Sequence, residues 1–313
     1  MNKFKSSSWI DIITDPENKK EALRVFGDFI KENELAILFG DTNSCKSLLA
    51  TDISLAVACN WETWEGKTMS ELPVGTPVFY YDLEMTEQQV ASRYANLEIP
   101  TYSLERITFA PTTLGQADLS DLYSDIISRL DGLEDSAVVV IDNMQCFVKN
   151  VQNANEVGIF MDALKNLLSI RKNLTIIVVG HCIKRNMKLP LTQNDLAGSK
   201  LIANKADSII GISESARDPE IRYVKMVKNR SSRRMKEVAE LEVTPERYLH
   251  LEFTGWGYEE DHLKKSRNGR PGIPDELRVR ILGLYSQHRS CRNIADTLGI
   301  SKSTVNRVIL GQI

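Results

Sequence analysis

The chain has 313 residues, is 42% hydrophobic and 26% charged, and has a formal net charge of −3 at pH 7, values that predict a globular protein with one large core and a smaller second domain. No apolar run reaches the roughly 18 residues of a membrane-spanning helix, and residues 1–8 lack the apolar stretch of a signal peptide. The five cysteines are scattered and never form a C-x-x-C pair, which argues against a zinc site or disulfide framework and favours a reducing, cytoplasmic location.

The first informative segment is a predicted strand, loop and helix between residues 35 and 59. Residues 35–39 form an apolar run, and an apolar helix is predicted from Lys46 onward. In such a loop, backbone N–H groups and the positive end of the helix face phosphates, the lysine reaches the β and γ phosphates, and Ser47 can ligand Mg²⁺. The candidate nucleotide-binding residues are Gly40, Asp41, Thr42, Asn43, Ser44, Cys45, Lys46 and Ser47.

Cys45 departs from the phosphate-loop pattern, which has glycine at this position. Glycine lets the backbone approach a phosphate closely, and a side chain there can crowd or redirect the loop. Because Lys46, Ser47 and the helix dipole remain, we expect the loop to bind ATP with Mg²⁺. The alternative interpretation of the segment is a surface turn before a helix.

Beyond this segment, predicted strands alternate with predicted helices up to residue 179, and short strands then follow one another closely. Alternation predicts an α/β fold with a mainly parallel sheet, whose sites gather at the carboxyl ends of the strands. The later strands are expected to form an antiparallel extension with hairpins. The predicted strands are 78–82, 107–110, 137–141, 174–179, 208–212, 222–228, 239–243 and 249–253, and the predicted helices are 87–97, 119–130 and 154–172.

Three polar residues that follow predicted strands are candidates for catalysis. Asp142 suits a carboxylate that organises Mg²⁺ through water, together with Ser47. Glu84 suits a general base that polarises the attacking water, and His181 is placed to sense the γ-phosphate. Each has a plainer interpretation as well: an N-cap or turn aspartate, an exposed loop glutamate, and a histidine that is simply hydrogen-bonded.

The carboxy-terminal region differs in charge and in pattern. From Lys264 onward there are ten Lys or Arg against three Asp or Glu, a net charge of +7, whereas the remainder carries −10. After a polar, Gly- and Pro-rich linker, three helices are predicted, with Ser290 and Ser301 as N-caps of the second and third. A tight turn at residues 299–301 makes these two helices a helix-turn-helix, whose last helix lies in the major groove of DNA.

The side chains expected to face DNA are Lys302, Ser303, Asn306 and Arg307. Residues 269–271 (Gly-Arg-Pro) and 291–305 resemble the DNA-binding domain of resolvase/invertase recombinases. The resemblance implies that Arg270 enters the minor groove. The resemblance does not imply recombinase catalysis, because a serine-recombinase catalytic domain is absent. A helix-turn-helix that binds protein instead of DNA remains an alternative.

The motifs of the larger region occur in an order that resembles the RecA-like ATPases of the replicative-helicase group. The pattern is similar to the DnaB-type core, and His181 with Lys184 is similar to the plasmid RepA-type hexameric ATPases. The resemblance covers about residues 22–255. Its motifs are 40–47, 83–85, 141–142, 181–184, 195–199 with 206–207, and 227–230.

The resemblance implies a ring in which nucleotide lies between subunits and Glu84 is the catalytic carboxylate. Lys228 and Arg230 would reach the γ-phosphate bound by the neighbouring subunit. The loop 185–200 would face a central channel and touch single-stranded DNA. The amino-terminal domain of replicative helicases has no counterpart here, so the resemblance does not extend to coupling with a primase.

Two classes of function fit these motifs. One is a DNA-stimulated ATPase or motor, such as a helicase, that loads on or opens DNA at a site chosen by its tail, as a plasmid or mobile-element replication protein would. The other is a DNA-binding regulator whose ATP site controls assembly and turns over little. The predicted segments are an amino-terminal segment (1–21), a RecA-like ATPase domain (22–257), a linker (258–274) and a helix-turn-helix domain (275–313). In the first segment, Trp9 and Ile10 are interpreted as an apolar anchor onto a neighbouring subunit, and packing on their own domain is an equal alternative.

Overall fold

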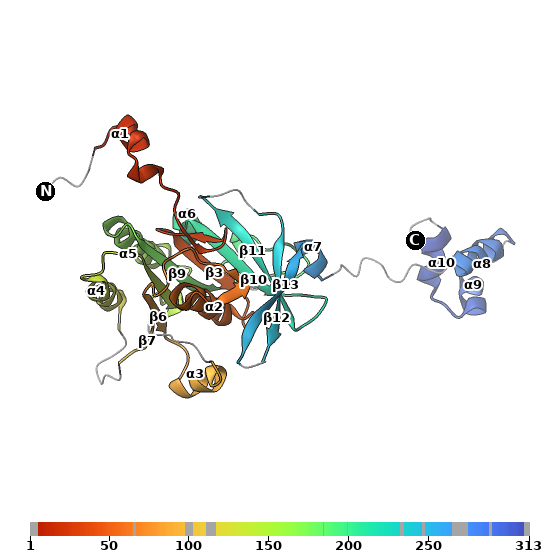
Figure 1. The fold of residues 1–313 in the computed structure, drawn as a ribbon. Helices are drawn as coiled ribbons and strands as arrows, with labels where there is room; N and C mark the ends of the chain where they lie inside the picture. Colours follow the sequence, from red (N-terminus) through yellow and green to blue (C-terminus); the bar gives the residue numbers. More distant parts are fainter. Residues whose placement is uncertain are drawn as a thin grey trace. The chain divides into compact units, whose positions relative to one another are not determined.

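The structure of the protein is a computed structural model (Figure 1). The chain divides into two compact units, Met1–Lys264 and Lys265–Ile313, each of which is considered by itself. The structure describes residues 6–64, 67–97, 103–110, 117–183, 185–198, 200–231, 235–245, 248–264, 275–287 and 290–309.

Figure 1 labels most of the helices and strands of the two units. The strands are β1 (Arg24–Phe26), β2 (Ile30–Lys31), β3 (Leu35–Gly40), β4 (Glu62–Trp64), β5 (Lys67–Thr68), β6 (Val78–Asp82), β7 (Leu104–Ile107), β8 (Ala137–Asp142), β9 (Leu174–His181), β10 (Ser208–Glu214), β11 (Ile221–Asn229), β12 (Val238–Thr244) and β13 (His250–Gly257). The helices are α1 (Trp9–Thr14), α2 (Lys46–Cys59), α3 (Glu87–Tyr94), α4 (Leu119–Leu130), α5 (Ala154–Ile170), α6 (Lys200–Lys205), α7 (Glu259–His262), α8 (Asp275–Ser286), α9 (Cys291–Leu298) and α10 (Lys302–Ile309).

The larger unit is organised around a nine-stranded sheet in the order β13-β12-β11-β10-β3-β9-β8-β6-β7. From β10 to β7 all neighbours pair in parallel, and from β10 to β13 they pair antiparallel. The predicted α/β fold, with a mainly parallel sheet and an antiparallel extension, is therefore confirmed. Because β3 lies between β10 and β9, the loop that follows it is held at the centre of the sheet.

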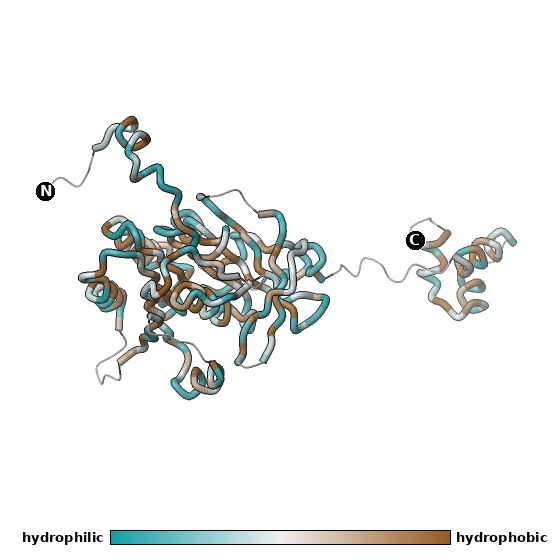
Figure 2. Tube along the Cα trace, viewed as in Figure 1, coloured by the Kyte–Doolittle hydropathy of each residue, from teal (hydrophilic) through white to brown (hydrophobic). Residues whose placement is uncertain are grey.

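Both faces of the central strands are covered, as expected for a parallel sheet. Side chains of Leu35, Ile37 and Phe39 pack with α4 and α5 on one face. The alternating side chains Ala36 and Leu38 pack with α2 on the other. Figure 2 shows the hydrophobic segments concentrated in these strands and in the helix faces that cover them. The apolar run 35–39 thus lacks a polar face because it has no solvent-exposed side.

Several predicted bounds differ from those observed. The strand expected at 107–110 is β7, Leu104–Ile107, and the helix expected at 87–97 ends at Tyr94. The short strands β1, β2, β4 and β5 were not predicted, because two or three residues are too few to show a period. α7 occupies the first part of the segment predicted as a linker and packs on β11. Residues 265–274 of that segment lie outside the described residues.

The smaller unit consists of α8, α9 and α10 around a compact apolar core. Its buried side chains are Ile281, Ile294, Ala295, Val305 and Val308. The side-chain oxygens of the predicted caps accept hydrogen bonds, Ser290 from the N–H of Asn293 (3.3 Å) and Ser301 from the N–H of Thr304 (3.1 Å). α9 ends at Gly299, whose φ of 63° suits glycine. The small all-α unit expected from the sequence is therefore present.

The amino-terminal helix α1 buries none of its residues, and Trp9 is 83% exposed. Since α1 has only six residues, it is too short to be stable by itself in water. Among the described residues, no helix is both long and apolar enough to cross a bilayer.

Candidate functional site

The loop between β3 and α2 is tightly packed at its first residue. A Cβ atom on Gly40 would lie 2.3 Å from the backbone oxygen of Ile212 and 2.4 Å from Oγ of Ser44, so a larger residue would require a shift of the backbone. The Ser44 hydroxyl is buried and has no hydrogen-bond partner within the described part of the chain. Glycine at position 40 is required by this contact with β10.

Two residues of the loop have a left-handed backbone. Asn43 has a φ of 64°, and Cys45, with φ 69° and ψ 29°, directly precedes α2. A left-handed conformation costs a residue with a side chain about 1–2 kcal/mol, which explains why phosphate loops favour glycine at position 45. The Cys45 Sγ lies 3.8 Å from the backbone oxygen of Asn43. Burial raises the pKa of the Cys45 thiol, so this thiol is protonated at neutral pH.

The side chain of Lys46 is 7% exposed and folds back over the loop. Its Nζ donates to the backbone oxygen of Asp41 at 2.7 Å. Burial lowers the pKa of the Lys46 ammonium, and the nearby Cys182, Asp142 and Glu84 partly oppose this shift. A buried cation surrounded by N–H donors of the loop and of the first turn of α2 is suited to bind a phosphate.

Asp142, at the end of β8, is buried beside the first turn of α2. Its Oδ2 accepts a hydrogen bond from the hydroxyl of Tyr80 at 2.9 Å. Burial raises the pKa of the Asp142 carboxyl, while hydrogen bonds from Ser47 and Tyr80 act in the opposite direction. The oxygens of Ser47 and Asp142 are hard ligands of the kind Mg²⁺ prefers, completed by water and substrate phosphates. Among the described residues, no group of three or more His, Cys, Asp or Glu could hold a metal ion.

Glu84 and His181 both lie next to the side chain of Asn143. The Nδ2 of Asn143 donates to Oε1 of Glu84 and lies 3.5 Å from Nε2 of His181. Burial and the Lys46 cation lower the pKa of His181, and Glu84 partly opposes this. The imidazole is therefore neutral at physiological pH. The sequence analysis named Glu84 and His181 but not Asn143, whose only sequence signal is that it follows Asp142.

Hydrogen bonds to Asp82 hold the backbone of the turn that contains Glu84. The buried Asp82 carboxylate accepts from the Nε of Arg106 at 2.7 Å and from the N–H of Met85 at 3.1 Å. Arg106 also donates to the backbone oxygen of Met85. The turn after β6 is thus tied to β7, which holds Glu84 at the carboxyl end of the sheet.

One cavity of about 350 Å³ brings most of these residues together. Arg93 of α3 and Leu249, just before β13, also line it, and neither has a sequence signal, because a single arginine or leucine matches no motif. Among the described residues, Arg93 forms no ion pair with a carboxylate. The predicted site residues at the cavity are Thr42, Asn43, Cys45, Lys46, Ser47, Glu84, Asp142 and His181.

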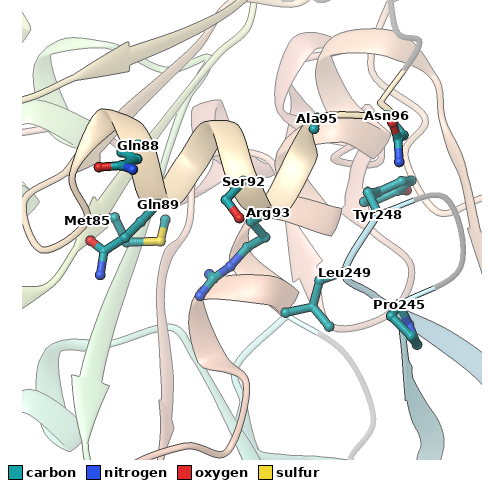
Figure 3. A pocket seen from close by; sticks show the side chains of 10 residues that line it. All are labelled: Met85, Gln88, Gln89, Ser92, Arg93, Ala95, Asn96, Pro245, Tyr248 and Leu249. Carbon is teal, nitrogen blue, oxygen red and sulfur yellow. The ribbon is translucent and has the colours of Figure 1, made fainter.

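A second cavity of about 650 Å³ shares Arg93 and Leu249 with the first. Figure 3 shows side chains of α3 and of the segment before β13 facing the same space. The N–H of Leu249 donates to the backbone oxygen of Arg93 at 3.3 Å, which joins the two segments. Among the described residues, the lining of this second cavity contains amides, a tyrosine and one cation, and no carboxylate.

Lys228 and Arg230 are not brought to the cavity. Ser208, at the start of β10, pairs with Asn229 and with Ala36, near the start of β3, so the end of β11 lies at the edge of the sheet opposite the loop 40–47. The Lys228 ammonium donates to the backbone oxygens of Ala203 and Ala206 at the end of α6. Arg230 is half-exposed, and its Nη1 lies 3.3 Å from Oδ1 of Asp207.

The expectation that the loop from Arg185 onward touches DNA is wrong for Arg185 itself. Its guanidinium is buried against Asp41, Ser213 and Tyr223, because these partners satisfy it inside the protein. Lys302 and Asn306 are exposed on α10. Lys184, Arg270 and the side chains of Ser303 and Arg307 lie outside the described residues.

The fold and the loop geometry define a P-loop nucleotide-binding protein with a RecA-like core. Residues 2–187 match the model of the AAA domain family AAA_25, which is more than half of the chain. The chain therefore belongs to this family of AAA domains and is a RecA-like P-loop ATPase. No curated protein matches it.

The fold also resembles a solved structure, the KaiC-like protein from the hyperthermophilic archaeon Pyrococcus horikoshii OT3. The TM-score is 0.52 at 14% sequence identity, and the similarity covers 74% of this chain and 99% of the archaeal chain. At this identity the likeness concerns the fold alone. It is consistent with the RecA-like arrangement of the sheet.

Proposed function

We propose that the protein hydrolyses ATP at the cavity formed by the loop 40–47 and the ends of β6, β8 and β9. Glu84 accepts a proton from water, whose oxygen attacks the γ-phosphorus as the bond to ADP breaks. Lys46 stabilises charge on the β and γ phosphates. Mg²⁺ held by Ser47 and, through water, by Asp142 would neutralise further phosphate charge. The observation that carries the proposal is the convergence of Lys46, Glu84, Asp142 and His181 on one cavity.

The test is steady-state ATP hydrolysis together with equilibrium binding of a fluorescent ATP analogue. Glu84→Gln should abolish turnover and keep nucleotide binding, because it removes the base and leaves the loop intact. The control is Glu87→Gln, at the exposed start of α3. Unchanged turnover in Glu84→Gln would remove Glu84 from the role of base, and no binding at millimolar nucleotide would remove the function altogether.

We further propose that the protein acts as a ring, with Lys228 and Arg230 completing the site of a neighbouring subunit, as in DnaB-type and RepA-type ATPases. Within one subunit these residues lie at the opposite edge of the sheet from Lys46, which supports a role toward a neighbour. Mass measurement with and without an ATP analogue and DNA tests this. A monomer under all conditions would exclude every role in trans.

We propose that the carboxy-terminal unit is a helix-turn-helix that directs the ATPase to duplex DNA, as in a replication protein of a plasmid or mobile element. The net charge of +7 from Lys264 onward supports binding to phosphates, and the exposed Lys302 and Asn306 on α10 support contacts to bases. Stimulation of ATP hydrolysis by single-stranded DNA would indicate a motor or helicase.

The second candidate function is an ATP-controlled DNA-binding regulator with little turnover. The left-handed backbone of Cys45 favours it, because strain and a side chain at this position disturb phosphate binding. The two functions differ in the measured turnover. A regulator would bind ATP, change its assembly state and hydrolyse slowly whether or not single-stranded DNA is present.

A further inference from the structure

The amide of Asn143 has a defined orientation at the end of β8. Its side chain is 2% exposed, and its Oδ1 accepts a hydrogen bond from the N–H of Gln145 at 2.8 Å. A backbone N–H can only donate, so this contact identifies the oxygen side of the amide. The Nδ2 group must therefore be the side that faces Glu84 and His181.

The Nδ2 group has two neighbours in the cavity. An amide nitrogen only donates, so Oε1 of Glu84 is its acceptor. The Nε2 of His181 lies 3.5 Å from the same nitrogen, and it accepts from Nδ2 in the tautomer that carries the imidazole proton on Nδ1. One buried amide thus contacts both the candidate base and the candidate γ-phosphate sensor.

We propose that Asn143 is a positioning residue for ATP hydrolysis, holding one oxygen of the Glu84 carboxylate so that the other is presented to the attacking water, and linking Glu84 to His181. The inference rests on the proposed function, because it assumes that Glu84 is the base. Oε1 bound to Nδ2 cannot rotate freely, and a carboxylate held in one orientation loses less entropy in the transition state. Asn143 itself does not touch the reacting atoms.

A purely structural role must be separated from this one, because Oδ1 of Asn143 also caps the short turn at Met144–Cys146. Asn143→Ser and Asn143→Asp both keep an oxygen that accepts from the N–H of Gln145. The aspartate has no donor for Glu84 when ionised, and the serine hydroxyl ends one bond short of the position of Nδ2. Asn150 offers a matched control. Its Oδ1 accepts from the N–H of Gln152 at 3.0 Å, also two residues later, away from the cavity.

The experiment measures kcat for ATP hydrolysis and the Kd of a fluorescent ATP analogue for the full chain. A general base contributes roughly 10²–10⁴-fold, so Asn143→Ser should lower kcat by at least ~10-fold with Kd unchanged. In Asn143→Asp a second carboxylate replaces the donor to Glu84 and repels the Glu84 carboxylate, so kcat should fall at least as far as in Asn143→Ser. Asn150→Ser should change neither quantity.

Three outcomes would overturn the inference. The first is a kcat of Asn143→Ser equal to that of Asn150→Ser. The second is a higher kcat, which would make Asn143 a restraint on Glu84. The third is a kcat of Asn143→Asp equal to that of wild type. Unchanged turnover in Glu84→Gln would instead overturn the proposed function. Loss of turnover in Glu84→Gln combined with wild-type behaviour of the Asn143 variants would overturn only the role of Asn143.

Discussion

The Nε of Arg185 lies 3.3 Å from Oδ2 of Asp41, although the two residues are 144 positions apart. The Arg185 side chain is only 2% exposed. Its Nη2 also donates to the hydroxyls of Ser213 (2.6 Å) and Tyr223 (3.3 Å). The segment that follows His181 is therefore anchored to the phosphate-binding loop and to β10 and β11 by one buried cation.

Replacing this cation should destabilise the larger unit. Arg185→Met removes the hydrogen bonds to Asp41, Ser213 and Tyr223 and leaves polar groups without partners, which costs about 1–3 kcal/mol. The free energy of unfolding, measured with urea, should fall by this amount. Arg217→Met is the matched control, because Arg217 is half-exposed and has one long contact with Glu240, worth about 0–1 kcal/mol. Equal losses in both variants would contradict the prediction.

Cys45→Gly should tighten nucleotide binding. Glycine adopts the φ of 69° observed at this position without strain, and it removes a side chain that lines the cavity. Cys45→Ala is the control that separates the causes, because alanine removes the thiol but keeps the left-handed strain. We expect a lower Kd for a fluorescent ATP analogue in Cys45→Gly and little change in Cys45→Ala. The same Kd in all three proteins would show that position 45 does not limit binding.

The stability of the larger unit should depend on pH through His181. Burial and the Lys46 cation lower the pKa of His181. At pH values below the ordinary histidine pKa of about 6.5, the folded state therefore binds fewer protons than the unfolded state. The contribution of neutral His181 to the free energy of unfolding is present above about pH 6.5. It is lost as the pH falls through the pKa that His181 has in the folded state. Urea unfolding at about pH 7.5 and about pH 5.5 should show a smaller difference in His181→Gln than in wild type. His250→Gln, outside the cavity, should behave as wild type.

Two inactive variants should restore activity when mixed, if subunits share sites. Arg230→Ala removes the residue proposed to act on the neighbour's nucleotide, and Glu84→Gln removes the base within a subunit. In a mixed ring, some interfaces contain both Glu84 and Arg230. The ATPase rate of the mixture should exceed the sum of the separate rates. A mixture no more active than its components would place both residues in the same site or show that no ring forms.

Arg307→Ala should weaken binding to the preferred DNA sequence by ~1–3 kcal/mol and relax specificity at the base pair it contacts. The measurement is the Kd for specific and scrambled duplexes at one salt concentration, because affinity depends steeply on salt. Arg280→Ala on α8 is the control outside the predicted recognition helix. Equal loss on both duplexes would assign Arg307 to a phosphate contact.

The sequence determined those features whose cause is local. The uninterrupted apolar run 35–39 and the spacing from Gly40 to Lys46 identified a buried strand and a phosphate-binding loop. The polar residues after predicted strands identified Glu84, Asp142 and His181. Parallel strands end at the same edge of a sheet, so these residues were expected together before any tertiary contact was known.

The tertiary structure alone decided which other side chains complete the cavity and which predicted residues do not. Asn143, Arg93 and Leu249 match no motif, and they reach the cavity through β8, α3 and the segment before β13. Arg185 has the sequence features of an exposed basic loop, yet it is buried because Asp41 and Tyr223 lie opposite it. Periodicity and spacing report neighbours along the chain. Contacts such as the one between Arg185 and Asp41 depend on how distant strands are ordered in the sheet, and that order follows from packing of the whole core.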